Sequence, residues 1–469
     1  METAGAASPK KRILTRDRSY YRDLVTLALP VAAQSAIAFL VTFADNLMVS
    51  SLGDTAVSGV YFASQINTLL QMFTGGIGGT ILILSAQYWG KRETLSIRRI
   101  VAVGTQFAVA VGLVVTLLCV IIPNRIMSIF TPDPAVQAQA AAYLRIVSIS
   151  FVFFSVSQAL IFAMRSVEVT KIGMYASMTS LVSNIVLNFL FIYVFRWGVQ
   201  GAAAATVISL AAQTAVILIY VLHTDDRLAM KLRDFLVSDG LLRHDFIKYG
   251  LPLVAGEIVW SVNMMCNSII FGRFFDETVS TAVSVANTMN TLAYITISGL
   301  ASAVGIITGK TVGAGRTELM KEYARTTQVL FLGVGIFSGA LVALLNAPFV
   351  KLYSIMPGGG ISAEAAAQAR MLIRVLSVTI IGTSYQMPCL FGLVKSGGDI
   401  SFVFKNDTIF VFCVVLPSAL ISALLGAPAW WVFACLKSDQ ILKCIVAFFK
   451  IRRYNWMKNL TRNTAKSAE

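Results

Sequence analysis

The chain has 469 residues, 57% of them hydrophobic and only 13% charged, and its formal net charge is +15. A soluble domain carries about 25% charged residues because its surface must be solvated, so a soluble fold is excluded. The mean hydropathy is +0.74, and short clusters of charge separate apolar runs of about twenty residues, the length that crosses a bilayer. Because lipid offers no partner for an open backbone amide, these runs are predicted to be helices.

About twelve such runs follow one another, and they predict an all-α membrane protein built as two six-helix lobes. In chain order the predicted spans are 24–50, 59–88, 100–122, 141–163, 173–195, 199–222, 246–274, 282–308, 326–348, 371–394, 403–425 and 429–449. The predicted units are a tail (1–23), an N-lobe (24–223), a linker (224–245), a C-lobe (246–450) and a second tail (451–469).

Basic residues are distributed unevenly between the two sides of the predicted spans. They cluster at 10–22, 91–99, 227–248, 310–325 and 450–466, in each case at a terminus or after an even number of spans. An excess of Lys and Arg marks the cytoplasmic side, so both termini are expected there, in the inner cell membrane. The clusters are expected to contact anionic membrane lipids rather than nucleic acid.

The linker Thr224–Asp245 mixes basic residues with leucines. This composition predicts an amphipathic helix that lies on the inner leaflet of the membrane.

The two halves of the chain are related in sequence. The paired positions are Gln65–Leu69 with Thr288–Leu292, Leu29–Pro30 with Leu251–Pro252, Gly76 with Gly299, Gly90 with Gly313, and Arg165–Ser166 with Lys395–Ser396. Six spans separate the repeats, so both begin on the same side of the membrane. We therefore expect a pseudo-twofold axis along the bilayer normal and a central cavity between the lobes. A duplication retained only for packing is the alternative.

Asp45 is the only acidic residue within the first span. A carboxylate at that depth costs a few kcal/mol unless it is paired or neutralised, and intramembrane ionisable groups are usually functional. Asp45 is therefore predicted to load and release a coupling proton or ion. The alternative is a carboxylate that bonds a neighbouring helix for packing.

Asn184, Asn188 and Thr206 are predicted to supply oxygen atoms near Asp45. The two asparagines are four residues apart and so share one helix face. Hard cations prefer several oxygen ligands, which two amides, a hydroxyl and one carboxylate provide. The alternative is interhelical hydrogen bonding, worth ~0.6 kcal/mol per bond in membranes.

Glu257, Trp260 and Asn263 form a candidate substrate site, or a second coupling site, in the C-lobe. The carboxylate of Glu257 suits a cation, and the indole ring of Trp260 offers a face to it. The alternative places Glu257 near the cytoplasmic boundary, where it stays hydrated.

The last predicted span contains Asp439 and Lys443 inside an otherwise apolar run. Residues four apart on a helix pair readily, which lowers the cost of inserting both charges. We expect a structural pair, with a role in gating as the second interpretation.

The residues needed for other chemistry are scattered. The two histidines, His223 and His244, lie in one predicted cytoplasmic loop, and the six cysteines lie apart in apolar spans. No cluster joins a nucleophile, base or metal ligand, so we expect no enzyme, no metal and no cofactor other than a coupling ion, H⁺ or Na⁺.

Several motifs resemble those of the MATE (multidrug and toxic compound extrusion) family. They are Ala28–Pro30 with Phe43–Asp45, Asn184–Asn188, Gly201–Thr206, Gly250–Pro252 with Glu257, Gly309–Arg316 and Lys395–Asp399. The resemblance runs from about Leu24 to Trp456 and implies two six-helix lobes around a V-shaped cavity. It implies exchange of protons or sodium ions for small organic, often cationic, compounds, with Asp45 as the acid of the first span. Some members carry aspartate where this chain has Asn188, which favours proton coupling here.

A flippase for lipid-linked oligosaccharides is the alternative function, since related families share the two-lobe design. Flippases usually carry cationic residues in the cavity, whereas the candidates named above are acidic or amide, which favours the exporter. One chain holds both lobes, so a monomer is expected to suffice.

Overall fold

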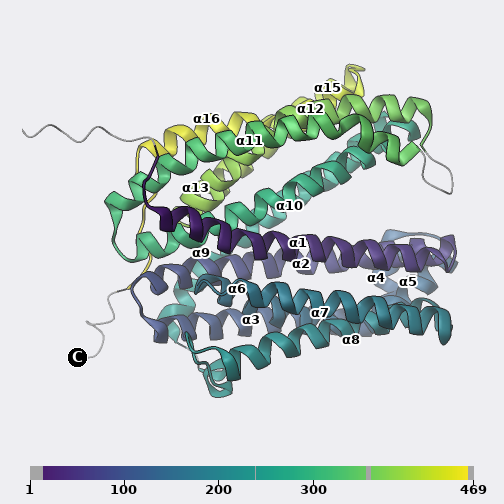
Figure 1. Ribbon diagram of the computed structural model, residues 1–469. Coiled ribbons are helices and arrows are strands. Elements are labelled where there is room, and N and C mark those ends of the chain that lie inside the picture. The colour runs from purple at the N-terminus through teal and green to yellow at the C-terminus, as the bar shows by residue number, and fades with distance from the viewer. Residues whose placement is uncertain (1–13, 238, 355–360, 463–469) are drawn as a thin grey trace, which may run out of the picture.

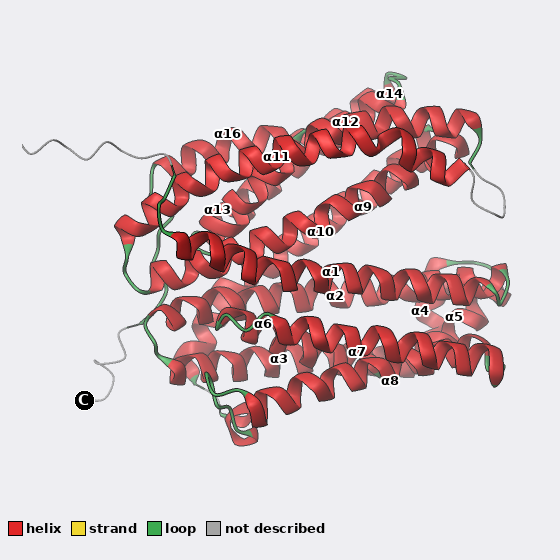
Figure 2. Ribbon diagram, viewed as in Figure 1, coloured by secondary structure: helices red, strands yellow, loops and turns green. Residues whose placement is uncertain are grey.

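The computed structural model describes residues 14–237, 239–354 and 361–462. Within these residues all of the secondary structure is helical, and the helices are joined by short loops (Figure 2). The outer parts of both predicted tails, 1–13 and 463–469, lie outside the described residues.

The N-lobe consists of α1 Arg18–Ser50, α2 Asp54–Gly90, α3 Thr94–Ile121, α4 Pro123–Phe130, α5 Pro134–Val147, α6 Ser150–Ser166, α7 Lys171–Asn188 with its π-helical end η1 Phe189–Val194, and α8 Gly198–Ile219 with η2 Tyr220–Thr224. The C-lobe consists of α9 Gly240–Phe274, α10 Glu277–Gly313, α11 Thr317–Ser354, α12 Ala363–Met387 with η4 Pro388–Lys395, α13 Ile400–Ile409, η5 Phe410–Val415, α14 Leu416–Leu424, α15 Ala429–Leu436 and α16 Asp439–Arg452. The lobes form two layers that lie close at one end and diverge toward the other (Figure 1).

Ten helices of the described part are long and apolar enough to cross a membrane. The pair α5 and α6 is bent by 50° at Ser148–Ile149, and it makes an eleventh candidate if the two helices are counted as one span. At that break the carbonyl of Ser148 accepts a hydrogen bond from Thr116 of α3 at 2.7 Å. The predicted twelfth span corresponds to the two shorter helices α15 and α16, which are separated at Lys437–Ser438.

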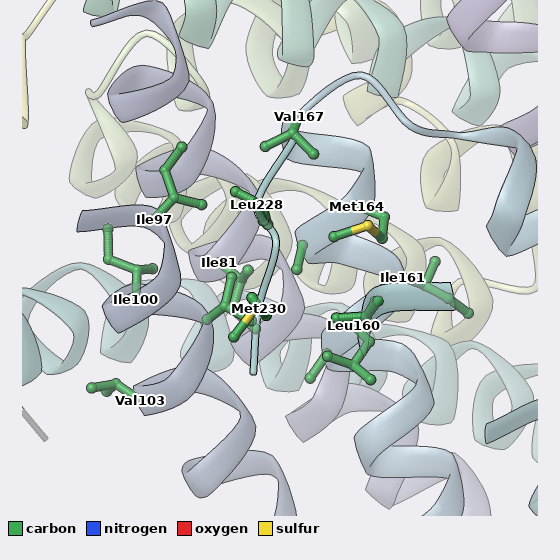
Figure 3. Close-up of a cluster of buried hydrophobic side chains, with 14 of the residues drawn as sticks. Ile81, Ile97, Ile100, Val103, Leu160, Ile161, Met164, Val167, Leu228 and Met230 are labelled. Atoms are coloured by element: carbon green, nitrogen blue, oxygen red, sulfur yellow. The ribbon is translucent and has the colours of Figure 1, made fainter. Parts of the chain in front are cut away.

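The prediction of an amphipathic helix over the linker Thr224–Asp245 is wrong. The linker contains turns and one short 3₁₀ helix, η3 Leu232–Leu236, and α9 begins at Gly240. Figure 3 shows Leu228 and Met230 inserted among side chains of α2, α3 and α6, where both are buried. Because other leucines of the linker face outward, including Leu236 at 84% exposure, no single apolar face exists for a helix to present.

The lobes meet where α2 crosses α10, and glycines allow the contact. A Cβ atom on Gly90 would lie 2.1 Å from the carbonyl oxygen of Lys310, and one on Gly313 would lie 1.9 Å from that of Gln87. Neither position admits a side chain without separating the helices. Gly90 and Gly313 are paired in the sequence repeat, and each here faces the other lobe.

A second repeat pair behaves in the same way. Gly76 of α2 packs against Val254 of α9, and Gly299 of α10 packs against Ala28 and Ala32 of α1, each too closely for a Cβ atom. Equivalent glycines thus support equivalent contacts, α2 with α9 and α10 with α1, as pseudo-twofold symmetry requires.

The first helix of each lobe begins in the core of the other lobe. At the start of α1, the Tyr20 hydroxyl lies 2.8 Å from that of Thr327 in α11, and its ring lies 4.6 Å from the Tyr323 ring. At the start of α9, the ring of Phe246 stacks on that of Phe107 in α3 with centroids 5.6 Å apart. The lobes therefore exchange their first helical turns at this end of the bundle, which also holds both described chain ends and is here called the termini end.

A C-terminal strap, Tyr454–Arg462, leaves α16 and crosses the termini end. The Trp456 side chain is fully buried against Gly397, where a Cβ atom would lie 2.3 Å from its ring. Lys458 donates its backbone N–H to the carbonyl of Gly397 and forms an ion pair with Asp399, both at 2.7 Å. This first part of the strap is fixed to the C-lobe.

The end of the strap reaches the N-lobe. The backbone N–H of Leu460 donates to the Gln87 side chain at 2.7 Å, and that of Arg462 donates to the Tyr88 hydroxyl at 3.1 Å. Nearby, Lys310 of α10 forms a 2.6 Å ion pair with Glu168, between α6 and α7. Polar contacts thus join the lobes around the glycine crossing.

Candidate functional site

The N-lobe site joins Asp45 of α1 to two asparagines of α7. Asn188 donates from Nδ2 to the Asp45 carboxylate at 2.5 Å and to Asn184 Oδ1 at 3.2 Å. Both asparagine side chains are fully buried, and Asn188 Oδ1 has no hydrogen-bond partner among the described residues. The structure therefore brings together three of the four residues predicted for this site.

Thr206 of α8 does not bond to this group. Its hydroxyl donates to the carbonyl of Ala202 at 3.1 Å, within its own helix. Tyr143 of α5, which was not among the predicted site residues, lies within electrostatic reach of Asp45 and within side-chain hydrogen-bonding reach of Thr206. Nothing in the sequence distinguishes this tyrosine from an ordinary core aromatic residue.

A cavity of about 410 Å³ lies between the lobes. Its walls come from α1, α2 and α6 of the N-lobe and from α9, α10, α12, η4, α13, η5 and α16 of the C-lobe. Glu257, Trp260 and Asn263 line it together, whereas Asp45 and its asparagines do not. The two predicted sites are thus separate places in the structure.

Glu257 faces this cavity from α9. Its carboxylate has no ion pair or hydrogen bond within the part of the chain that the structure describes, and Tyr294 of α10 lies within its electrostatic reach. Trp260 is 51% exposed, and Asn263 Oδ1 is buried without a hydrogen-bond partner among the described residues. The carboxylate of Glu257, the exposed indole ring of Trp260 and the amide oxygen of Asn263 therefore line the same cavity.

Asp439 and Lys443 line the same cavity and lie 3.0 Å apart. A third member, Asp407 in α13, lies 2.8 Å from the Lys443 ammonium. Exposure of the three side chains is low, 17% for Asp407, 8% for Asp439 and 7% for Lys443. Asp407 was not among the predicted site residues, although it is an acid inside the predicted span 403–425 and meets the same criterion as Asp45.

Gln440 fixes one member of this triad. Its Nε2 donates to both carboxylate oxygens of Asp439, at 3.0 and 3.1 Å. Its Oε1 accepts from Thr383 at 3.1 Å and from Gln386 at 3.0 Å, both in α12. Asp439 is therefore held by a chain of amides that ends on a neighbouring helix.

The expectation of an acidic or amide cavity is incomplete, because cations also line it. Arg165 and Lys395, which the sequence repeat pairs, both lie in the wall, as does Lys443. Arg165 donates to the side chain of Gln34 at 2.6 Å, and Lys395 lies over the Phe391 ring, 4.9 Å from its centroid. Three cations and three carboxylates thus share one cavity.

No group of three or more His, Cys, Asp or Glu side chains within residues 14–237, 239–354 and 361–462 is arranged to hold a metal ion. The site is built of carboxylates, amides, aromatic rings and basic side chains.

The sequence model of the MatE family matches residues 30–190 and 252–427, well over half of the chain and a long stretch of each lobe. The chain belongs to the MatE family. A Geobacillus kaustophilus protein described as probable multidrug resistance protein NorM is 25% identical over 427 residues, covering 88% of this chain and 90% of the relative. A Listeria monocytogenes protein of the same description is 23% identical over 344 residues, covering 72% and 75%.

Solved structures show the same fold. A crystal structure of a MATE protein in complex with MaL6 has a TM-score of 0.84 at 19% identity and covers 93% of this chain and 97% of its own. A MOP superfamily transporter from Pyrococcus furiosus, described as having a binding pocket of reverse polarity, has a TM-score of 0.81 at 19% identity, covering 95% and 97%. As a member of the MatE family, the protein is a multi-span membrane transporter and not an enzyme.

Proposed function

We propose that this MatE protein exports small organic cations across the inner cell membrane in exchange for protons or sodium ions. The observation that supports this most directly is the unpaired Glu257 carboxylate, which lines the cavity between the lobes together with the exposed Trp260 ring. A cation with an apolar body satisfies both groups at once. The relatives described as probable multidrug resistance proteins support the same substrate class.

Asp45 is the proposed coupling group. It lies outside the cavity, so a proton or ion and a substrate can occupy the protein at separate places. The observed amide orientation, with Asn188 donating to Asp45, suits an ionised carboxylate. A protonated Asp45 is a hydrogen-bond donor, and a bound cation also attracts the amide oxygen of Asn188. Binding of a proton or ion at Asp45 therefore favours a flipped Asn188 amide, with its oxygen toward Asp45. With one carboxylate in the group, we favour a proton as the coupling ion.

Transport proceeds by alternating access between the lobes. Lys91, Lys310 and Arg462 lie at the termini end, and basic residues mark the cytoplasmic side, so this end and both termini face the cytoplasm. The glycine crossing and the C-terminal strap then hold the lobes together on that side. Rocking the lobes apart there, and together at the far end, exposes the cavity alternately.

A single chain supplies every part of this cycle, since both lobes and both sites lie within it. A monomer is therefore sufficient. The basic residues of the termini end are placed to contact anionic lipids of the inner leaflet.

The test is efflux of ethidium from a pump-deficient bacterium under separate proton and sodium gradients. Wild type is compared with Asp45→Asn, Glu257→Gln and the exposed control Glu318→Gln. We expect both site variants to lose efflux, the control to retain it, and a proton gradient alone to support it. A wild type that expresses well and moves no dye under either gradient contradicts the proposal.

The cavity cations Arg165 and Lys395 favour a second candidate, a flippase for lipid-linked oligosaccharides, since they suit a diphosphate group. Reconstituted vesicles containing a fluorescent polyprenyl diphosphate distinguish the two. Translocation of this lipid that Arg165→Gln and Lys395→Gln abolish supports the flippase. Ethidium efflux that survives both substitutions supports the exporter.

A further inference from the structure

The triad Asp407–Lys443–Asp439 has more negative charge than its own lysine can neutralise. The second carboxylate comes from a different helix, α13, and the whole group lies in the cavity wall. A pair that only stabilises α16 needs one acid, which Asp439 supplies within the helix. Leaving a further carboxylate buried costs free energy unless something else neutralises it.

Lys437 adds positive charge on the Asp439 side of the triad. It lies within electrostatic reach of Asp439, its ammonium is 5.7 Å from the centroid of the Phe433 ring, and the residue is not part of the cavity wall. Taken alone, the triad has two carboxylates and one ammonium, so a single positive charge at Asp407 brings it to zero.

The two carboxylates of the triad are held differently. Asp439 accepts both hydrogen bonds of Gln440 as well as the charge of Lys443, four residues along the same helix. Within the described residues the Asp407 carboxylate forms an ion pair with Lys443 alone, and its Oδ1 atom is buried without a hydrogen bond of good geometry. Asp407 is thus the carboxylate from which the lysine is more easily displaced.

We propose that Lys443 is a tethered counterion that the protonated amine of a substrate displaces from Asp407. In the empty cavity the lysine ammonium occupies this carboxylate. When a substrate ammonium binds Asp407, Lys443 remains paired with Asp439, and the group becomes neutral. Asp407 is therefore a substrate-binding residue, and Lys443 sets the affinity by competing with the substrate.

The position also selects the chemistry of the substrate. A ligand that replaces a lysine ammonium must itself be a compact hydrogen-bond donor, which describes primary and secondary amines. The Phe404 ring in the cavity wall and the Phe410 ring, 5.8 Å from the Lys443 ammonium, flank this place and suit the apolar body of an amine. Cations without N–H donors, such as tetraphenylphosphonium, gain less from Asp407.

The inference rests on the proposed export of organic cations but is tested by binding alone. Dansylcadaverine, a fluorescent primary amine, and its neutral N-acetyl derivative are titrated against the full-length protein in detergent. Competition predicts that Lys443→Met lowers the Kd for the amine about tenfold and that Asp407→Asn raises it about tenfold, as charge pairs at binding sites do. The acetyl derivative should respond to neither substitution.

Lys321→Met is the matched control, since Lys321 forms a 2.6 Å pair with the exposed Glu318 on α11 and neither residue is part of the cavity wall. If Lys443→Met and Asp407→Asn leave the Kd for the amine unchanged, the triad is structural and the inference fails. If Lys443→Met does not fold, Asp407→Asn decides alone, because it keeps the Lys443–Asp439 pair. If the wild type exports ethidium but the triad substitutions do not change amine binding, only this inference is overturned. If the wild type exports no cation at all, the export proposal is overturned.

Discussion

Arg462 and Asp245 form a bidentate ion pair, with Nε 2.6 Å and Nη2 2.7 Å from the two carboxylate oxygens. The hydrogen bonds and charge of Asp245 raise the pKa of Arg462 above its already high usual value, so the guanidinium stays charged at every physiological pH. Asp245 belongs to the start of α9, which packs on the N-lobe. The pair therefore fastens the last residue of the strap at the place where the lobes exchange their first turns.

We expect Arg462→Ala to open the termini end more often. A partly exposed pair contributes up to about 1 kcal/mol, which corresponds to about a fivefold change in an opening equilibrium. The measurement is the alkylation rate of Ser396→Cys, a buried position in the cavity wall, in a variant lacking the native cysteines. Arg453→Ala, an exposed position just before the strap, is the control. Equal rates in both variants would show that the strap does not hold this end closed.

Gly313→Ala is expected to abolish dye efflux and lower the melting temperature in detergent. The added methyl group would lie 1.9 Å from the carbonyl of Gln87, so α2 and α10 must separate. Overpacking of this kind typically costs about 1–3 kcal/mol. Gly333→Ala in α11 is the matched control, because nothing lies within 4 Å of its added Cβ. If both substitutions have the same effect, the close crossing is not required.

Asn188→Asp is expected to make efflux responsive to sodium. A second carboxylate beside Asp45 completes an oxygen set of higher charge, which hard cations prefer. The measurement is dye efflux driven by an imposed sodium gradient at constant pH, compared with one driven by a proton gradient. Asn188→Ala, which removes the donor to Asp45 and adds no charge, is the control. If the wild type already shows sodium-driven efflux, and Asn188→Asp does not change its rate, then the number of carboxylates at this site does not determine the coupling ion.

Tyr323→Phe is expected to loosen the start of α1 in a pH-dependent manner. The Tyr323 hydroxyl donates to Asp17 at 2.5 Å, and this bond, followed by that from Ser19, lowers the pKa of Asp17 below its usual value of 3.8. Because the pKa of Asp17 is lower in the folded state, this interaction stabilises the folded state at pH values above 3.8. The stabilisation is lost as the pH falls through the pKa that Asp17 has in the folded state. The variant should thus be about 1–2 kcal/mol less stable at pH 7, with the difference shrinking in acid. Thermal melts between pH 3 and pH 7 measure it, and a constant difference would contradict it.

Spacing along single helices predicted the parts of the site that depend on local geometry. Asn184 and Asn188 share a face because they are four residues apart, and an acid in the first span required a partner, which Asn188 provides. The repeat also predicted which glycines are equivalent, although only the structure shows that Gly90 and Gly313 face opposite lobes. The positions of the helices could be predicted from the apolar runs, because a helix needs about twenty apolar residues to cross the bilayer.

Contacts between distant segments could not be predicted in this way. The linker leucines are divided between the N-lobe core and the surface, a division that depends on where α2, α3 and α6 lie. The strap is a short segment without periodicity, and its partners come from different lobes: Gln87 lies in α2, and Asp399 lies in the turn just before α13. Asp407 is the exception, since its depth was visible in the sequence and only its partner Lys443 was not.

The exchange of first turns between the lobes has a consequence for how the protein can be assembled. Each half-chain carries a helical start, Tyr20 in one and Phe246 in the other, that completes a core it does not itself contain. Two separately translated polypeptides, divided within the linker after Met230, would therefore each bring a docking element for the other. The same reciprocity means that neither half reaches its final packing alone, so the N-terminal half must await synthesis of the C-terminal half.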